Sequence, residues 1–440
     1  MILPRSLAVL GAALLATSLL VGSAQATDTT HAFIGARILP ISGDPIEEGT
    51  LVIENGRIVA VGPSASVRIP GDAEKHDVHG KVIMPGLVDT HSHVGGPAGG
   101  DKSSPIQPEC RVMDSFDVRD AGIQKAQAGG LTTANIMSGS GHLISGQTIY
   151  VKFRDGRTID GLLLRDKDGQ PLGGLKMANG TNSQDDPPFP GTRSKSAALV
   201  RAQYVKAQEY RDKIKRAKKD KDRPDRDLGL DALVEAMDGK RVVHQHTHRA
   251  DDIITALRLQ KEFGYRIVLH HVSEAWKVAD EIAAAKAPCS IILIDSPGGK
   301  LEAMEMDWKT GGILEKAGVK VAIHTDDGIT DSRLFLRSAG LAVRGGNSRE
   351  GALRALTLAG AEMLDLEDRI GSLEKGKDAD FIILTGDPLS VYTMVQETWV
   401  DGVRVFDRND PKDRLYAVGG WGASRPQSFV WCCFEEGGPQ

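Results

Sequence analysis

Eight of the twelve histidines lie in four short clusters whose spacing suits the binding of a metal ion. In a strand, residues two apart point to the same side, so His91 and His93 can present two imidazoles to one ion. Neutral imidazole is a good ligand for zinc and similar divalent ions. The other clusters are His244, His246 and His248; His270 and His271; and His324, which Asp326 follows. One His-x-His pair is weak evidence, but four clusters together predict a metal centre.

The elements that must position these clusters alternate between strand and helix. Apolar runs at 241–244, 265–269, 290–294 and 319–323 are typical of strands, and their starts are roughly 25 to 30 residues apart, as in βα units. Residues 249–263 have a helical pattern that Gly264 would end. This repeat fits a (β/α)8 barrel or an open doubly wound sheet. Ligand-type residues at the ends of several different strands favour the barrel.

Segments rich in β-structure flank the central region on both sides. Residues 51–62 are two apolar runs across an Asn55-Gly56 turn, a strong hairpin signal. Strands are also expected at 379–384 and 395–400, and the second of these turns at Asp401-Gly402 into 403–406. We therefore expect a small β-sandwich domain from both chain ends. Its two parts are residues 27–84 and 371–418, around a barrel at 85–370, and a tail follows at 419–440.

Residues 1–26 are a different kind of sequence. Arg5 precedes an apolar run at 7–21, and Ala24 and Ala26 are small residues at the positions that a signal peptidase reads. This pattern predicts a secretory signal peptide and a periplasmic or secreted protein. The alternative is an uncleaved membrane anchor, but the run is short for a bilayer span. After cleavage we expect no stable membrane insertion.

Composition excludes several classes of function. The net charge of -5 gives no case for a nucleic-acid or anionic-membrane partner. A helical segment at 196–221 ends in a basic run, but interspersed aspartates indicate a solvated helix end. No C-x-x-C pair supports a cysteine zinc site, and no Gly-x-Ser-x-Gly motif supports a serine hydrolase. Cys432-Cys433 in the tail has no physical explanation, and an oligomer is compatible with the sequence.

Four motifs give the chain a family resemblance. The sequence resembles the amidohydrolase superfamily, and within it the imidazolonepropionase-like branch, which also holds exported dipeptidase-like members. The resemblance extends from about residue 32 to about residue 410. The motifs are PGLVDTHSH at 85–93, HTHRADDI at 246–253, IHTD at 323–326 and GSLEKGKDAD at 371–380.

The resemblance implies a ligand set and two catalytic residues. His91 and His93 match the ligands of the more buried metal, and Lys176 lies where some relatives carry a carboxylated lysine that bridges two metals. His246 and His271 match ligands on the fifth and sixth barrel strands. Asp326 matches the eighth-strand ligand and general acid/base, with His271 as the second catalytic candidate. Alternatives stay open: His244 or His248 for His246, His270 for His271, Asp327 for Asp326, and a plain ion pair for Lys176.

The implied activity is hydrolysis of an amide, cyclic amide or peptide-like C–N bond (EC 3.5 or 3.4) by metal-activated water. Zinc is the expected cofactor, as one or two ions, although manganese, iron or cobalt suit the same ligands. The substrate would be a small molecule or a dipeptide, with a periplasmic dipeptidase as one form. A deaminase of amino-substituted heterocycles and a non-catalytic metal-binding barrel are the alternatives. Candidate substrate-binding residues, each of which could instead be structural, are His142, Asn179, His248 and Arg249.

Overall fold

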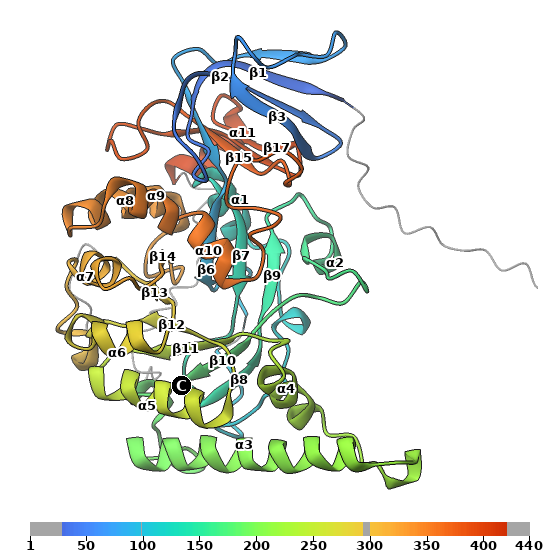
Figure 1. Ribbon diagram of the computed structural model, residues 1–440, viewed down its shortest axis with the longest axis vertical. Coiled ribbons are helices and arrows are strands. Elements are labelled where there is room, and N and C mark those ends of the chain that lie inside the picture. Colours follow the sequence, from blue (N-terminus) through green and yellow to red (C-terminus); the bar gives the residue numbers. More distant parts are fainter. Residues whose placement is uncertain (1–28, 98, 294–299, 420–440) are drawn as a thin grey trace, which may run out of the picture.

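The computed structural model describes residues 29–97, 99–293 and 300–419 of the chain (Figure 1). The expected signal peptide at 1–26 and the Cys432-Cys433 pair lie outside the described residues. Within the described ranges, no helix has both the length and the apolar character needed to cross a bilayer.

Strands from both ends of the chain form one eight-stranded sheet, which we call the terminal sheet. Its order is β17-β16-β15-β5-β1-β2-β3, and β4 also pairs with β1. Because β15 pairs antiparallel with β5, the two chain ends share one set of hydrogen bonds. The two chain ends therefore do come together as predicted. They form one sheet, and the strand pairings do not show the expected β-sandwich. The strands are β1 (His31–Ile38), β2 (Ile46–Glu54), β3 (Arg57–Pro63), β4 (Glu74–Asp77), β5 (Val82–Pro85), β15 (Phe381–Leu384), β16 (Val395–Val400) and β17 (Val403–Asp407).

Two tight turns connect neighbouring strands of this sheet. Asn55 and Gly56 between β2 and β3 both have positive φ, at 50° and 74°. Asp401 and Gly402 between β16 and β17 repeat this pattern, at 48° and 74°. Two-residue turns of this kind match the twist of antiparallel strands and favour Asn-Gly and Asp-Gly. Both predicted hairpins are confirmed.

The central region holds two further sheets. One has the order β14-β13-β12-β11-β10-β8 and the other β6-β7-β9. Neighbours pair in parallel except for β8 with β10 and β9 with β7. The strands are β6 (Leu87–Ser92), β7 (Leu131–Ile136), β8 (Ile144–Gln147), β9 (Ile149–Lys152), β10 (Leu175–Ala178), β11 (Val243–Thr247), β12 (Ile267–His271), β13 (Cys289–Ile291) and β14 (Val321–Ile323).

The two central sheets meet at both of their edges without becoming one sheet. At one junction, Thr148 alone separates β8 from β9, and its backbone N–H donates to Gly174 O at 3.0 Å. At the other, the backbone N–H of Asp326 donates to His91 O at 2.9 Å. Because β14 has three residues and Asp326 leaves the extended conformation with φ of 49°, no ladder forms between β14 and β6. The described residues thus give an α/β fold with mixed sheets, and the closed barrel that the sequence predicts is not detected among their hydrogen bonds.

Helices connect and flank the central strands. The long helix α3 lies at the opposite end of the molecule from the terminal sheet (Figure 1). The predicted helix at 249–263 is confirmed as α5, which ends at Gly264 with φ of 76°. The helices are α1 (Ala121–Ala128), α2 (Ile159–Leu162), α3 (Arg193–Arg216), α4 (Leu228–Met237), α5 (Ala250–Phe263), α6 (Ala279–Ala284), α7 (Thr310–Lys316), α8 (Phe335–Arg344), α9 (Arg349–Ala355), α10 (Leu358–Met363) and α11 (Pro411–Val418).

A buried lysine attaches the terminal sheet to the central strands. Lys152, the last residue of β9, is fully buried. Its Nζ lies 2.6 Å from Asp378 and 3.0 Å from Asp380, and it also contacts Asp401. A buried charge is tolerated when it is paired in this way. The GSLEKGKDAD motif therefore contributes Asp378 and Asp380 to the contact between the sheets.

Candidate metal centre

The parallel pairing of β11 with β12 brings two of the four histidine clusters to neighbouring positions. In the β11–β12 pairing, His246 is opposite His270 and Thr247 is opposite His271. The strands extend further than the sequence indicates, so His244 and His246 lie inside β11, while His270 and His271 are the last residues of β12. His91 lies in β6, and His93 is the first residue after the end of this strand.

Asp326 lies between the two histidines of the His-x-His motif. Its Oδ1 is 3.4 Å from His91 Nε2 and 3.0 Å from His93 Nε2. The other ring nitrogen of His93, Nδ1, donates to Met137 O at 2.8 Å, because a carbonyl oxygen can only accept. The Nε2 atom of a neutral His93 therefore presents a lone pair to a carboxylate oxygen. A proton or a metal cation must lie there to make the contact favourable.

Lys176 and His271 approach the same place from β10 and β12. The Nζ of Lys176 lies 3.3 Å from His91 Nε2 and 3.2 Å from Met137 Sδ. His271 Nδ1 lies 3.9 Å from Asp326 Oδ2 and 3.1 Å from His324 Nε2. The structure thus brings together every ligand that the resemblance implied on β6, β10 and β12 and after β14. His324, a clustered histidine to which the resemblance gave no role, joins them.

The hydrogen bonds distinguish His246 from its neighbour His244. Both ring nitrogens of His244 have partners, with Nε2 at 3.1 Å from Tyr150 Oη and Nδ1 at 3.0 Å from His270 Nε2. His246 is buried, and neither of its ring nitrogens has a hydrogen-bond partner. The Nε2 atoms of His248 and His271 are also buried without a partner.

These unpartnered nitrogens fit a cation. Buried polar atoms without partners are costly, and native structures satisfy nearly all of them. His246, His248 and Glu302 place ligand atoms within 4.8 Å of one another, and so do His91, His93 and Asp326. A third such group is His91, His271 and His324. The cluster could therefore hold a divalent metal ion.

Burial sets the protonation states that a metal requires. It lowers the pKa of His246 and His271 well below the ordinary value, and the pKa of His248 and His324 to about 3. These rings are therefore neutral near pH 7. Burial also lowers the pKa of Lys176 to about 7, although Asp326 opposes the shift.

Asp326 stays ionised despite its burial. Burial by itself raises the pKa of this carboxyl, but a hydrogen bond from a proton on His93 Nε2 and the positive charge of Lys176 hold the pKa well below its ordinary value. The centre thus combines neutral imidazoles with the Asp326 carboxylate, a donor set that suits zinc and similar ions.

A buried link that the sequence analysis missed places Asp326. Asp89 accepts hydrogen bonds from the Thr325 backbone N–H at 3.1 Å and from the Thr325 hydroxyl. It also accepts from the His91 backbone N–H at 3.2 Å. The alternation of PGLVDTHSH, which puts Asp89 on the same side as His91, was the available signal. Asp326 and His271 both have positive φ, at 49° and 68°, as strained residues at functional sites often do.

The four substrate-binding candidates are placed differently. His248 is in the cluster, and its Nδ1 lies 2.7 Å from Ser273 Oγ. His142 is buried and donates to Asp101 O at 2.8 Å. Asn179 donates to Asp252 O at 2.9 Å. Arg249 lies at the surface, where it pairs with Asp251 at 3.0 Å. Only His248 therefore shares a ligand group with the clustered histidines.

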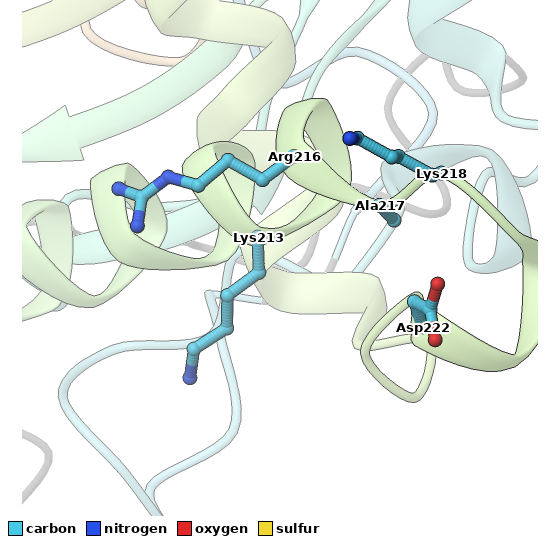
Figure 2. A pocket seen from close by; sticks show the side chains of 5 residues that line it. All are labelled: Lys213, Arg216, Ala217, Lys218 and Asp222. Carbon is cyan, nitrogen blue, oxygen red and sulfur yellow. The ribbon is translucent and has the colours of Figure 1, made fainter.

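Two hollows in the surface lie apart from the cluster. Figure 2 shows the first, of about 350 Å³, at the end of α3; its lining residues are Lys213, Arg216, Ala217, Lys218 and Asp222. The second, of about 900 Å³, lies between α3 and α5 and includes Asn179 and Gln245. Gln245 alternates with His246 along β11, so this hollow is on the other side of that strand. Neither hollow is lined by a clustered histidine, so the candidate site is located by its ligand-type residues and not by a surface hollow.

The chain belongs to the amidohydrolase family, which it matches over residues 82–405. It is similar to the crystal structure of an amidohydrolase from Thermotoga maritima MSB8, with 32% sequence identity and a TM-score of 0.79 over 86% of this chain and 100% of that one. The chain is also similar to an imidazolonepropionase from Paracoccus denitrificans, with 42% identity over 78 residues. That segment covers 18% of this chain and 19% of the relative. These likenesses support the imidazolonepropionase-like branch of the superfamily.

A longer relative is the amidohydrolase TasK of Hapsidospora irregularis. It is 27% identical over an alignment of 394 positions, which covers 82% of this chain. The chain spans 40% of the length of that relative.

The Asp89–Thr325 link gives a testable prediction. Thr325→Val removes the hydroxyl that donates to Asp89 and accepts from the Asp327 backbone N–H at 3.0 Å. Because a buried carboxylate then loses a donor, we expect the free energy of unfolding to fall by about 1–3 kcal/mol in urea denaturation. Thr325→Ser keeps the hydroxyl and should lose less. A larger loss in Thr325→Ser than in Thr325→Val would show that the methyl group, and not the hydrogen bonds, matters.

Proposed function

We propose that this protein is a metal-dependent hydrolase of a C–N bond in an amide, cyclic amide or peptide-like substrate. The observation that carries the proposal is the buried cluster in which Asp326 faces His91 and His93 while His246 and His271 retain unpartnered nitrogens. Membership of the amidohydrolase family supports the same class of reaction.

The proposed ligands fall into two groups around Lys176. His91, His93 and Asp326 would hold one ion, and His246 and His271 would hold a second, with His248 and His324 beside them. Zinc suits this mixture of imidazole and carboxylate, and manganese, iron or cobalt could replace it. When bound, such an ion makes water acidic enough to ionise near neutral pH and polarises the scissile carbonyl.

Asp326 is the proposed general acid/base. Its low pKa keeps it as a carboxylate that can take a proton from the attacking water. It would later return that proton to the leaving nitrogen, so that the C–N bond breaks as the amine departs. His271, whose Nδ1 lies 3.9 Å from Asp326 Oδ2, is the second residue that we place in catalysis.

Lys176 is the proposed bridge between the two ions, as a carbamate. A neutral amine is the form that adds carbon dioxide, which yields a carbamate oxyanion and releases one proton. Burial favours that neutral amine by lowering the pKa of Lys176 to about 7. The nearest group to its Nζ on the ligand side is a neutral imidazole, not a carboxylate, at 3.3 Å.

Dipeptides and N-acyl amino acids are the first substrates that we propose, followed by cyclic amides. Membership of the amidohydrolase family and the amide chemistry of the proposed centre support this class of substrate. Deamination of an amino-substituted heterocycle is the alternative on the same centre, because the same water could attack a ring carbon. Release of ammonia, rather than of an amino acid, distinguishes the two.

Replacement of Asp326 tests the catalytic assignment. Asp326→Asn should lower kcat at least about 100-fold, because general acid–base catalysis is lost, while the protein still holds metal. The matched control is Asp327→Asn, since the Asp327 carboxylate accepts hydrogen bonds from the backbone N–H and the hydroxyl of Ser332. Assays of product release on an amide panel, with elemental analysis, measure both effects. If Asp327→Asn abolishes turnover and Asp326→Asn does not, the assignment is wrong.

Metal counting tests the carbamate bridge. Protein prepared with bicarbonate should hold about two ions per chain, and Lys176→Ala should hold fewer because the bridging oxygens are lost. Lys176→Glu restores a carboxylate at the same position and should recover part of the loss. An unchanged metal content in Lys176→Ala would rule out the bridge. No tightly bound metal in the unaltered protein would rule out the proposed centre.

We also propose that the protein is exported to the periplasm or secreted, on the basis of the pattern at residues 1–26. The exported protein should begin at Thr27 when its N-terminus is sequenced. An intact Met1 on protein recovered from the periplasm would contradict cleavage.

A further inference from the structure

A second group of ligand-type side chains lies on the terminal sheet. It consists of His31 on β1 and Glu74 and His76 on β4, which we call the β1–β4 triad. In the parallel pairing of these strands, His31 is opposite Glu74 and Phe33 is opposite His76. Residues two apart on a strand share a face, so the three side chains of the triad lie on one face of the sheet.

The spacing of the ligand atoms suits one metal ion. His31 Nδ1 lies 3.0 Å from His76 Nε2. The carboxylate of Glu74 lies 3.6 Å from His31 Nδ1 and 3.7 Å from His76 Nε2. With zinc bonds of about 2.0–2.2 Å, tetrahedral ligand atoms lie roughly 3.3–3.6 Å apart. The observed separations bracket that spacing.

The carboxylate is directed at the two rings without bonding to them. At 3.6 and 3.7 Å its oxygens are beyond hydrogen-bond distance from both imidazoles. The rings are largely enclosed, since the side chain of His31 is 12% exposed and that of His76 is 22% exposed, whereas Glu74 is 59% exposed. A cation would be reached from solvent on the Glu74 side and held by the enclosed rings.

The surroundings keep the rings in place and suitable as ligands. His76 stacks on Phe33, with ring centroids 4.5 Å apart and an angle of 11°. Burial lowers the pKa of His76, although Glu74 opposes this shift, so the ring is neutral near pH 7. The nearby Arg404 is an unfavourable positive charge, but Glu397 at 3.5 Å and Asp407 at 3.2 Å balance it.

We propose that the β1–β4 triad binds one divalent transition-metal ion, such as zinc or copper, with water in the remaining coordination position. This site is separate from the proposed catalytic centre, since its ligands come from β1 and β4 of the terminal sheet. Because β4 has four residues and pairs only with β1 among the described strands, the ion would link these two strands through their side chains.

Trp399 provides a local reporter for this site. Its ring centroid lies 5.3 Å from that of His31 and 5.9 Å from that of His76. Bound copper quenches indole fluorescence at such short range. Addition of Cu²⁺ to the protein with its own metal already in place should therefore quench the Trp399 emission, and Trp399→Phe should remove that quenching.

Equilibrium dialysis against Zn²⁺ is the test that does not depend on fluorescence. The unaltered protein should bind one more equivalent than His76→Ala or His76→Gln, and both variants should weaken zinc binding at this site at least about tenfold. The control is His79→Ala, because His79 is an exposed histidine of the same region that pairs with Asp77. It should keep the extra equivalent.

The outcomes are distinct from those of the proposed catalysis. Loss of the extra equivalent in His76→Gln, with hydrolytic activity and circular dichroism unchanged, supports the site. Equal zinc binding in the unaltered protein, His76→Gln and His79→Ala overturns it. Quenching by Cu²⁺ that persists in His76→Gln also overturns it.

Discussion

The structure depends on the burial of neutral imidazoles around one ionised carboxylate. Desolvation opposes charge on His246 and His271, and it also opposes the charge of Asp326. Such an arrangement lowers the stability of the fold if nothing binds to the unpartnered lone pairs of the imidazoles. Buried donors and acceptors without partners have lost their hydration and gain no hydrogen bond in return. A cation offsets that cost, which is why metal binding and the stability of the central strands should be coupled.

The geometry of the centre follows from the way in which the central sheets meet. Parallel strands bring residues from distant parts of the chain to one end of a sheet, as β11 and β12 do for His246 and His271. Asp326 is placed by other means, because β14 forms no ladder with β6. Asp89, the Thr325 hydroxyl and the bond from the Asp326 backbone to His91 take over that task.

The terminal sheet has a supporting role that also creates chemistry of its own. Lys152 joins it to β9 through three aspartates, two of which belong to the GSLEKGKDAD motif. On the same sheet, the parallel pairing of β1 and β4 brings His31 next to Glu74 and His76. The same physical device, side chains of neighbouring strands on one face, therefore underlies both groups of candidate ligands.

Local patterns in the sequence determined much of the fold. The Asn55-Gly56 and Asp401-Gly402 turns, the helix that ends at Gly264 and the strands that carry the histidines all depend on nearby residues, and all are present. The motif at 85–93 likewise contained both His91 and Asp89. These features could be read from the sequence because turn geometry, helix capping and strand alternation act over a few residues.

Only the tertiary structure decided which histidine of each cluster has free nitrogens. His244 and His246 lie on the same strand, two residues apart. Tyr150 and His270 contact the two ring nitrogens of His244, whereas the ring nitrogens of His246 have no partner. The tertiary structure also decided that Arg249 lies at the surface and that no ladder joins β14 to β6 among the described strands. These features depend on contacts between residues far apart in the chain, and such contacts cannot be read from the local sequence.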